Sequence, residues 1–192
     1  MQRNQKHRPL IAICATALFG ALAVALYALG FPIFPAAPFL RLDFSDVPAL
    51  LAALLFGPIY GVAVNLIQNL FGFLVLGSAA AHAGIGNLMN FMVGTAFIVP
   101  YALIVRHAAA KKRSLALASL IGFMSILVIG FGMNTLVMPL FFRFYVGMPP
   151  AQIWPMVWGT IWFATALNGI KGVVLSVAGV AIARMKGRFR FN

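Results

Sequence analysis

Long apolar stretches follow one another along almost the whole chain, and they restrict its possible folds more than any other feature. They cover residues 9–30, 85–105, 115–142 and 152–183. A transmembrane helix needs about 20 apolar residues, because the hydrocarbon core is about 30 Å thick and each residue adds about 1.5 Å. The stretches are too long for the strands of a membrane barrel. They predict an all-α integral membrane protein, since a helix satisfies its own backbone hydrogen bonds inside lipid.

Basic residues set the expected orientation. The net charge is +12, but most of the charge lies at the chain ends and in one loop, as the positive-inside rule describes for cytoplasmic segments. This placement predicts a membrane protein with both termini in the cytoplasm, an even number of crossings and no nucleic-acid partner. The three clusters are Arg3, Lys6 and Arg8; Arg106, Lys111, Lys112 and Arg113; and Arg184, Lys186, Arg188 and Arg190.

Six membrane crossings meet this requirement for an even number. Two shorter apolar segments, 47–56 and 62–76, lie between the first and fourth spans and are separated by the turn Gly57-Pro58. Loops are expected outside the membrane at 31–44 and 77–84. We therefore expect a single six-helix bundle, an all-α transmembrane domain of residues 1–192 with short cytoplasmic tails at about 1–8 and 184–192. Short or interrupted segments often lie near a transporter's binding site.

The only two acidic residues of the chain, Asp43 and Asp46, lie together just before the second span. Ser45-Asp46-Val47-Pro48 is typical of a helix start, because Ser or Asp can cap the free N–H groups and proline suits the first turn. We expect this loop to close over a site from outside. An ordinary surface loop that caps a helix is the alternative.

Several enzyme classes lack their motifs in this sequence. It contains neither a Gly-x-x-x-x-Gly-Lys-Ser/Thr phosphate loop nor a Gly-x-Ser-x-Gly nucleophile elbow. The three histidines, His7, His82 and His107, are isolated at loop positions and are expected to be interfacial rather than metal ligands. We predict a protein that is not an enzyme, with no resident cofactor and no metal.

Three polar residues interrupt the last two spans. Lys171 is costly at the centre of a membrane helix and should face a polar cavity or a partner. Asn168 lies three residues earlier on the same face, and Asn134 lies in the preceding span. Together they predict one polar cavity, although contacts between helices or a lysine reaching for the surface would also explain them. Both aspartates are expected at the outer membrane edge, so neither is an obvious partner for Lys171.

A stripe of small residues follows the first span, with Ala17, Ala21 and Ala25 at intervals of four. Small side chains at this spacing let another helix approach closely. The stripe is either a docking surface for a partner protein or a packing surface inside the bundle.

These features together resemble the S components of energy-coupling-factor (ECF) vitamin transporters, most closely the riboflavin-specific type. The resemblance rests on LDFSDVPALLAALLFGPIYG at 42–61, GIGNLMNFMVG at 84–94, Asn134, and Asn168-Gly-Ile-Lys171. It implies six helices, a bacterial cell membrane, and a vitamin pocket that opens outward beneath the first loop. It also implies assembly with a transmembrane coupling subunit and two ATPase subunits, which fits the missing phosphate loop.

The resemblance also implies roles for individual residues. Riboflavin is the expected transported ligand, and another vitamin or a stand-alone carrier is the alternative. Two positions depart from the family, because Gln68 and Asn87 stand where relatives often carry lysine and glutamate. Ala17, Ala21 and Ala25 would contact the coupling subunit. The expected ligand-binding residues are Asn134, Asn168, Lys171, Asp43, Phe44, Ser45 and Asn90.

Overall fold

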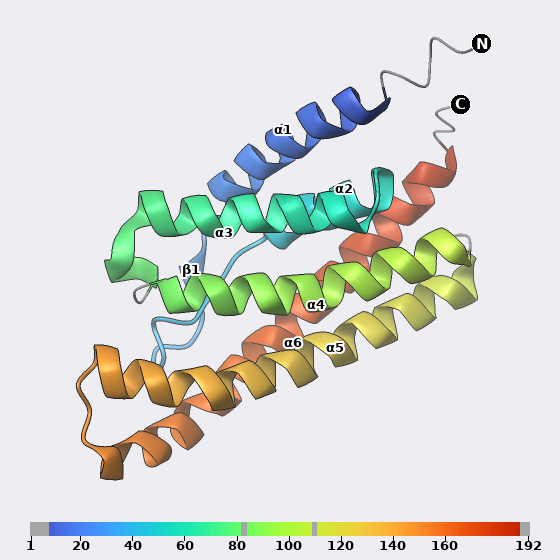
Figure 1. Ribbon diagram of the computed structural model, residues 1–192. Helices are drawn as coiled ribbons and strands as arrows, with labels where there is room; N and C mark the ends of the chain where they lie inside the picture. The colour runs from blue at the N-terminus through green and yellow to red at the C-terminus, as the bar shows by residue number, and fades with distance from the viewer. Residues whose placement is uncertain (1–7, 82–83, 109–110, 189–192) are drawn as a thin grey trace.

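The protein is an α-helical bundle in the computed structural model, which describes residues 8–81, 84–108 and 111–188 (Figure 1). A five-residue π-helix, η3, follows α5, and the strands β1 and β2 form a small antiparallel hairpin between α1 and α2. The elements, in chain order, are α1 Arg8–Ala28, β1 Phe31–Pro32, β2 Arg41–Leu42, α2 Asp46–Leu55, α3 Pro58–Ala81, α4 Ile85–His107, α5 Lys112–Leu140, η3 Phe141–Tyr145 and α6 Pro150–Arg188.

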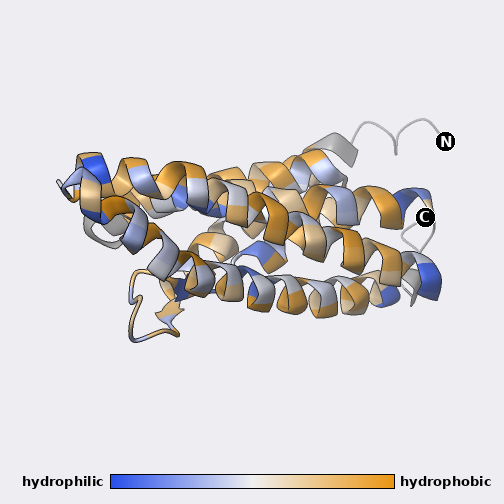
Figure 2. Ribbon diagram, turned by 90° about the horizontal axis from the view of Figure 1, so that it is seen from below, coloured by the Kyte–Doolittle hydropathy of each residue, from blue (hydrophilic) through white to orange (hydrophobic). Residues whose placement is uncertain are grey.

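Five of these helices are long and apolar enough to cross a membrane, namely α1, α3, α4, α5 and α6. Apolar residues run along the helices, whereas hydrophilic residues gather at the ends of the bundle (Figure 2). The chain is therefore a multi-pass membrane protein, and the all-α prediction with six helices is confirmed. As the sequence predicts, α2 is short, and its ten residues cover about 15 Å, roughly half of the hydrocarbon core.

Helix α2 forms the centre of the bundle. It contacts α1, α3, α4 and α6, and Leu50 and Leu54 are among its fully enclosed side chains. The turn after it depends on Gly57, whose φ of 134° favours glycine. Gly61 then lets α3 approach closely, because a Cβ there would lie 2.6 Å from the Ala53 Cβ. The apolar 47–56 segment is thus a buried core element that covers only half of the membrane thickness.

Three details differ from the sequence predictions. Helix α3 continues to Ala81, so the predicted loop at 77–84 is largely helix; its alanines are strong helix formers that outweigh the glycine at 77. Helix α6 extends to Arg188 rather than ending at 183. Ser45 precedes α2 as predicted but makes no side-chain cap, because its hydroxyl bonds to Asp43 instead.

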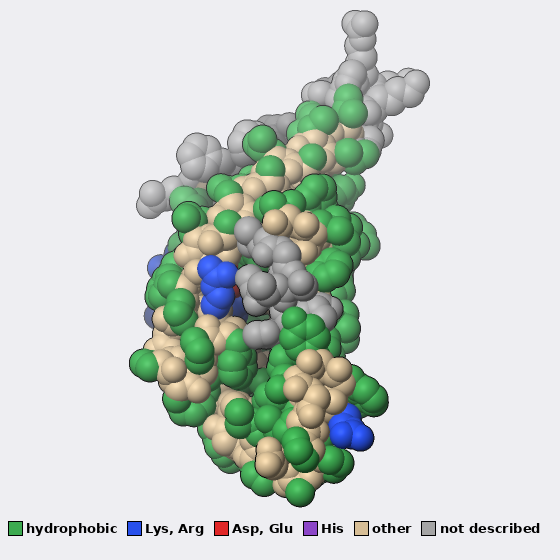
Figure 3. Space-filling view, turned by 90° about the vertical axis from the view of Figure 1, so that its left-hand side faces the viewer, with side chains coloured by type: hydrophobic (Ala, Val, Ile, Leu, Met, Phe, Trp, Pro, Cys, Tyr) green, Lys and Arg blue, Asp and Glu red, His purple; other side chains and the backbone are tan. Residues whose placement is uncertain are grey.

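The described parts of the three basic clusters share one end of the bundle. The start of α1, the junction between α4 and α5, and the end of α6 all lie there (Figure 1). The opposite end carries the β-hairpin and η3. On the part of that end not covered by grey atoms, basic side chains are sparse (Figure 3). The two ends therefore differ in charge, as expected for the two faces of a membrane protein.

Candidate functional site

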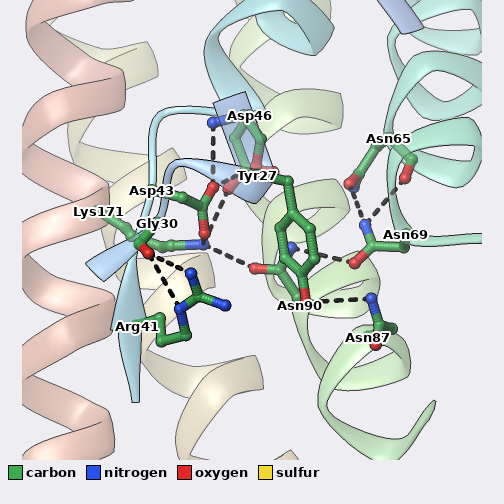
Figure 4. A network of polar contacts seen from close by, with 11 residues as sticks. Tyr27, Gly30, Arg41, Asp43, Asp46, Asn65, Asn69, Asn87, Asn90 and Lys171 are labelled. Atoms are coloured by element: carbon green, nitrogen blue, oxygen red, sulfur yellow. Dashed lines mark hydrogen bonds and ion pairs between the residues drawn. The ribbon is translucent and has the colours of Figure 1, made fainter. Parts of the chain in front are cut away.

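Lys171 of α6 is the centre of a buried polar network (Figure 4). Only 5% of its side chain is exposed. Its ammonium Nζ lies 3.3 Å from Asp43 Oδ2 and 3.4 Å from Asp46 Oδ2, and it donates a 2.6 Å hydrogen bond to Asn90 Oδ1. An ammonium has three donors, so these three partners use its full capacity. Lys171 therefore joins α6 to α4, to the start of α2 and to the chain just before it.

The prediction that both aspartates lie too far out to pair with Lys171 is wrong. Helix α2 ends just before the Gly57 turn, which lies beside Arg106 near the basic end, and from there it covers only about 15 Å towards the opposite face. Asp46 is its first residue, so it lies near mid-depth, where Lys171 is also found. The short length of α2 thus places the carboxylates inside the bundle.

The carboxylate of Asp43 is held in place by hydrogen bonds from Ser45. Its Oδ1 accepts a 3.0 Å hydrogen bond from the Ser45 backbone N–H and a second one from the Ser45 hydroxyl. Ser45 is itself fully buried. These bonds fix the carboxylate so that its other oxygen faces Lys171, which ties the first loop to α6.

A chain of amides connects this network to α3. Asn90 Nδ2 donates to Asn69 Oδ1 at 3.1 Å, and Asn69 Nδ2 donates to Asn65 Oδ1 at 2.8 Å. Asn65 Nδ2 in turn donates to Thr95 Oγ1 at 3.0 Å. The amides hold α3 and α4 together and leave Asn90 oriented towards Lys171.

Two more residues lie beside this network: Tyr27 in the last turn of α1 and Arg41 on β2 (Figure 4). Asn87 Nδ2 donates a 3.1 Å hydrogen bond to the Tyr27 hydroxyl. Arg41 Nε donates to the Gly30 carbonyl at 3.0 Å, and its Nη2 donates to the same oxygen. The hairpin is therefore tied to the last turn of α1.

A cavity opens between the hairpin and helices α1, α4, α5 and α6. It lies beside the start of α4 and the end of α5, in the half of the bundle away from the basic clusters. Aromatic and apolar side chains make most of its wall, with a few polar groups among them, as is usual for small-molecule sites. Its lining includes Tyr27, Phe39, Arg41, Asp43, Met89, Asn90, Asn134, Met138, Phe141, Leu167, Asn168 and Lys171.

Two asparagines in the cavity wall keep unused hydrogen-bonding capacity. Asn134 Nδ2 donates to the Gly130 carbonyl at 2.6 Å, and its Oδ1 has no partner among the described residues. Asn168 is mostly buried, and its side chain makes no hydrogen bond within the described part of the chain. It packs on Gly130, where a Cβ would lie 2.1 Å from Asn168 Nδ2. Together they offer a donor and two acceptors to a molecule in the cavity.

The structure brings together most of the predicted site. Asn134, Asn168, Lys171, Asn90 and Asp43 all line the cavity, and they do so as one group. Two predicted ligand-binding residues are not among the lining residues: Phe44 is 45% exposed, and Ser45 lies behind Asp43.

Sequence reasoning missed Tyr27, Arg41 and the partnership of Asp46 with Lys171. The signal for Tyr27 was available, because it is the one aromatic hydroxyl in the alanine-rich first helix and lies in its last turn. Of the two departures, Asn87 binds Tyr27, whereas Gln68 is buried without a side-chain partner among the described residues. His107 is exposed, and its ring nitrogen Nδ1 forms a hydrogen bond with the Leu103 carbonyl; His7 and His82 lie outside the described residues.

The alanine stripe of α1 lies on the outside of the bundle. Ala17, Ala21 and Ala25 are all exposed, whereas Ala12 and Ala23 on the other side of α1 are buried. The alternative that the stripe packs inside this bundle is therefore wrong. The surface is available to lipid or to another protein.

Known proteins resemble this chain in sequence and in fold. Residues 12–183 match the family model "ECF transporter, substrate-specific component". The chain is 30% identical over 166 residues to the riboflavin transporter FmnP of Bacillus subtilis, which covers 86% of each protein. It is 36% identical over 112 residues to the riboflavin transporter RibU of Staphylococcus aureus, covering 58% of this chain and 54% of that protein. A solved S component of a bacterial ECF transporter superposes with a TM-score of 0.73 at 26% identity, covering 96% of this chain and 99% of the other.

Proposed function

Because this chain belongs to the substrate-specific components of ECF transporters, we propose that it is the riboflavin-binding subunit of an ECF-type importer. It captures the vitamin on the outside, and partner subunits drive uptake with ATP. Riboflavin is the cargo here and not a resident cofactor, and the chain itself is not an enzyme. The names of its relatives, both riboflavin transporters, support this assignment.

The unused amides of Asn134 and Asn168 carry the proposal. The flavin ring is flat and apolar over most of its area, and its pyrimidine edge presents carbonyl acceptors on both sides of an N–H donor. The cavity offers matching groups, because Asn134 Oδ1 can accept and the Asn168 amide can both donate and accept. Tyr27, Phe39 and Phe141 supply aromatic wall for the ring.

The charges of the site also suit a neutral ligand. The ammonium of Lys171 already has Asp43, Asp46 and Asn90 as partners, so it is not free to bind an anionic ligand. A vitamin with two carboxylates would find Arg41 as the remaining basic group among the lining residues. An uncharged vitamin with a hydrogen-bonding edge is the better match.

The orientation follows from the charge distribution. With the basic end in the cytoplasm, both termini lie inside and the cavity lies in the outer half of the membrane beneath the β-hairpin. Labelling of single cysteines in intact cells, after Cys14 is replaced by serine, tests this. A cysteine that replaces Phe144 should react with an impermeant reagent from outside, whereas one that replaces His107 should not.

The first functional prediction concerns the two amides. Asn134→Ala and Asn168→Ala should each weaken riboflavin binding by about 1–3 kcal/mol, because each leaves a buried flavin group unpaired. Quenching of riboflavin fluorescence by the purified protein measures the affinity. The wild-type preparation should also be yellow. Unchanged affinity in both variants would remove the cavity from the proposal, and preferential binding of a different vitamin would overturn the assignment to riboflavin.

The second prediction concerns the alanine stripe, which we propose as the docking surface for the coupling subunit. Ala21→Trp should still bind riboflavin in detergent, since Ala21 is exposed and does not line the cavity. It should fail to co-purify with the coupling subunit and the two ATPases and fail to support uptake, because bulk prevents close helix approach.

Leu136→Trp is the matched control for this substitution. Leu136 is 70% exposed on α5, so the variant adds the same bulk to a different surface. It should retain assembly and uptake. If both variants assemble normally, the docking surface is elsewhere. If the wild-type protein accumulates riboflavin alone, against a gradient and without ATPase subunits, the proposed importer is wrong and a stand-alone carrier is right.

A further inference from the structure

The ion cluster at Lys171 contains two carboxylates and one ammonium, all buried. If every group were ionised, the cluster would carry a charge of −1. Arg41 on β2 directs its guanidinium to the carbonyls of Ala28 and Gly30. Within the described residues, the other neighbours of the cluster are uncharged: the Tyr27 phenol of α1, the Asn65 amide of α3 and the Asn90 amide of α4. Arg41 lines the same cavity, but its hydrogen bonds go to backbone carbonyls, and among the described residues Lys171 is the one basic side chain that forms an ion pair with either carboxylate.

The two carboxylates have different surroundings. Asp43 accepts two hydrogen bonds from Ser45 and faces Lys171 with its other oxygen. Asp46 has Lys171 at 3.4 Å from Oδ2, but its Oδ1 is enclosed and has no partner among the described residues. That oxygen packs on Gly94, because a Cβ there would lie 2.5 Å from it.

We propose that Asp46 binds a proton at neutral pH and is held as a neutral carboxylic acid beside an Asp43–Lys171 ion pair. Burial disfavours the charged form of a carboxyl group, and a second carboxylate nearby disfavours it further. Donors to the charged form favour ionisation, and Asp43 has more of them than Asp46. Two carboxyl groups in unlike environments commonly divide into one acid and one carboxylate. The bound proton makes the cluster neutral overall, with Asp43 as the carboxylate that ties the first loop to α6.

The composition of the chain makes this proposal directly measurable. Asp43 and Asp46 are its only acidic side chains. The full chain, labelled with ¹³C-carboxyl aspartate and placed in lipid nanodiscs without ligand, should show the C=O infrared band of a protonated carboxylic acid at pH 7. This band should shift with the label and should disappear in Asp46→Asn.

A second variant assigns the proton without changing Asp46. In Asp43→Glu, with only aspartate labelled, the label-sensitive band should remain, because Asp46 still carries it. A wild-type spectrum without the band overturns the proposal. So does a band that loses its label sensitivity in Asp43→Glu, since the proton would then belong to position 43. Both outcomes can be read even if Asp46→Asn fails to fold.

Ligand binding provides a second test of a neutral Asp46, and this test rests on the proposed function. Asparagine has nearly the shape of a neutral aspartic acid, so Asp46→Asn should bind riboflavin within about threefold of the wild type. A tenfold or larger loss in a folded Asp46→Asn protein contradicts a neutral Asp46. The infrared measurement uses no riboflavin, so an incorrect ligand assignment would leave it intact.

Discussion

Lys171→Met is expected to destabilise the protein by about 3–5 kcal/mol, a large fraction of the stability of a typical fold. Methionine fits the space of the lysine stem but removes the only ion-pair partner of Asp43 in the described structure. A carboxylate left buried without its partner costs far more than the pair contributed. Thermal unfolding in detergent should show a large decrease in the melting temperature, and riboflavin binding should be lost.

Two further variants separate charge from packing. Leu175→Met, one turn further along α6, is a volume-conserving change of a buried side chain and should cost less than about 1.5 kcal/mol. Adding Asp43→Asn to Lys171→Met removes the unpaired carboxylate and should restore much of the lost melting temperature. If Lys171→Met melts like the Leu175→Met control, the ion cluster does not stabilise the fold.

Gly130→Ala is expected to weaken riboflavin binding by roughly 2–4 kcal/mol, or about 30- to 1000-fold, while the protein stays folded. Both cavity amides depend on this glycine. Its carbonyl accepts from Asn134 Nδ2, and its Cα hydrogens are packed against Asn168. A methyl group would overlap Asn168 Nδ2 and turn that amide away from the ligand. Because the overlap is with the end of a side chain, the backbone of α5 need not move.

Gly132→Ala provides the matched control for this change. It lies two residues further along α5, where a Cβ would meet nothing within 4 Å. It should bind riboflavin like the wild type and have equal or higher stability, since alanine favours helix. Fluorescence quenching measures affinity in both variants. Equal affinities for Gly130→Ala and Gly132→Ala would show that the Asn134–Asn168 pair does not hold the flavin.

Some parts of the site could be predicted from the sequence, because they follow from the free-energy cost of placing a single polar residue in lipid. Lysine and asparagine are unfavourable in lipid, so Lys171, Asn168 and Asn134 had to face a polar space. All three line the same cavity. The helices were predictable for the same reason, because length and apolar character decide them.

Other parts depend on how deep a residue lies within the bundle, and sequence patterns do not show that depth. The position of Asp46 beside Lys171 depends on how far α2 reaches into the bundle and on which helices surround it. The pattern also could not show that the side chain of Ser45 would bond Asp43 rather than cap α2, since both are local options for a serine. The sequence pattern also ends α3 too early, because one glycine weakens a helix less than the alanines after it favour one.

The pairing of Lys171 with Asp46 joins residues 125 positions apart, and this separation has a consequence for biosynthesis. Helix α2 is synthesised early, but the lysine that pairs with its first residue lies in α6, which leaves the ribosome only after α3, α4 and α5. Until then Asp43 and Asp46 have no ammonium to pair with, and α2 is too short to cross the bilayer as an independent span. Contacts so distant in sequence form late. The centre of this bundle is therefore completed only when α6 inserts, and a chain truncated before α6 should be recognised as incomplete and degraded.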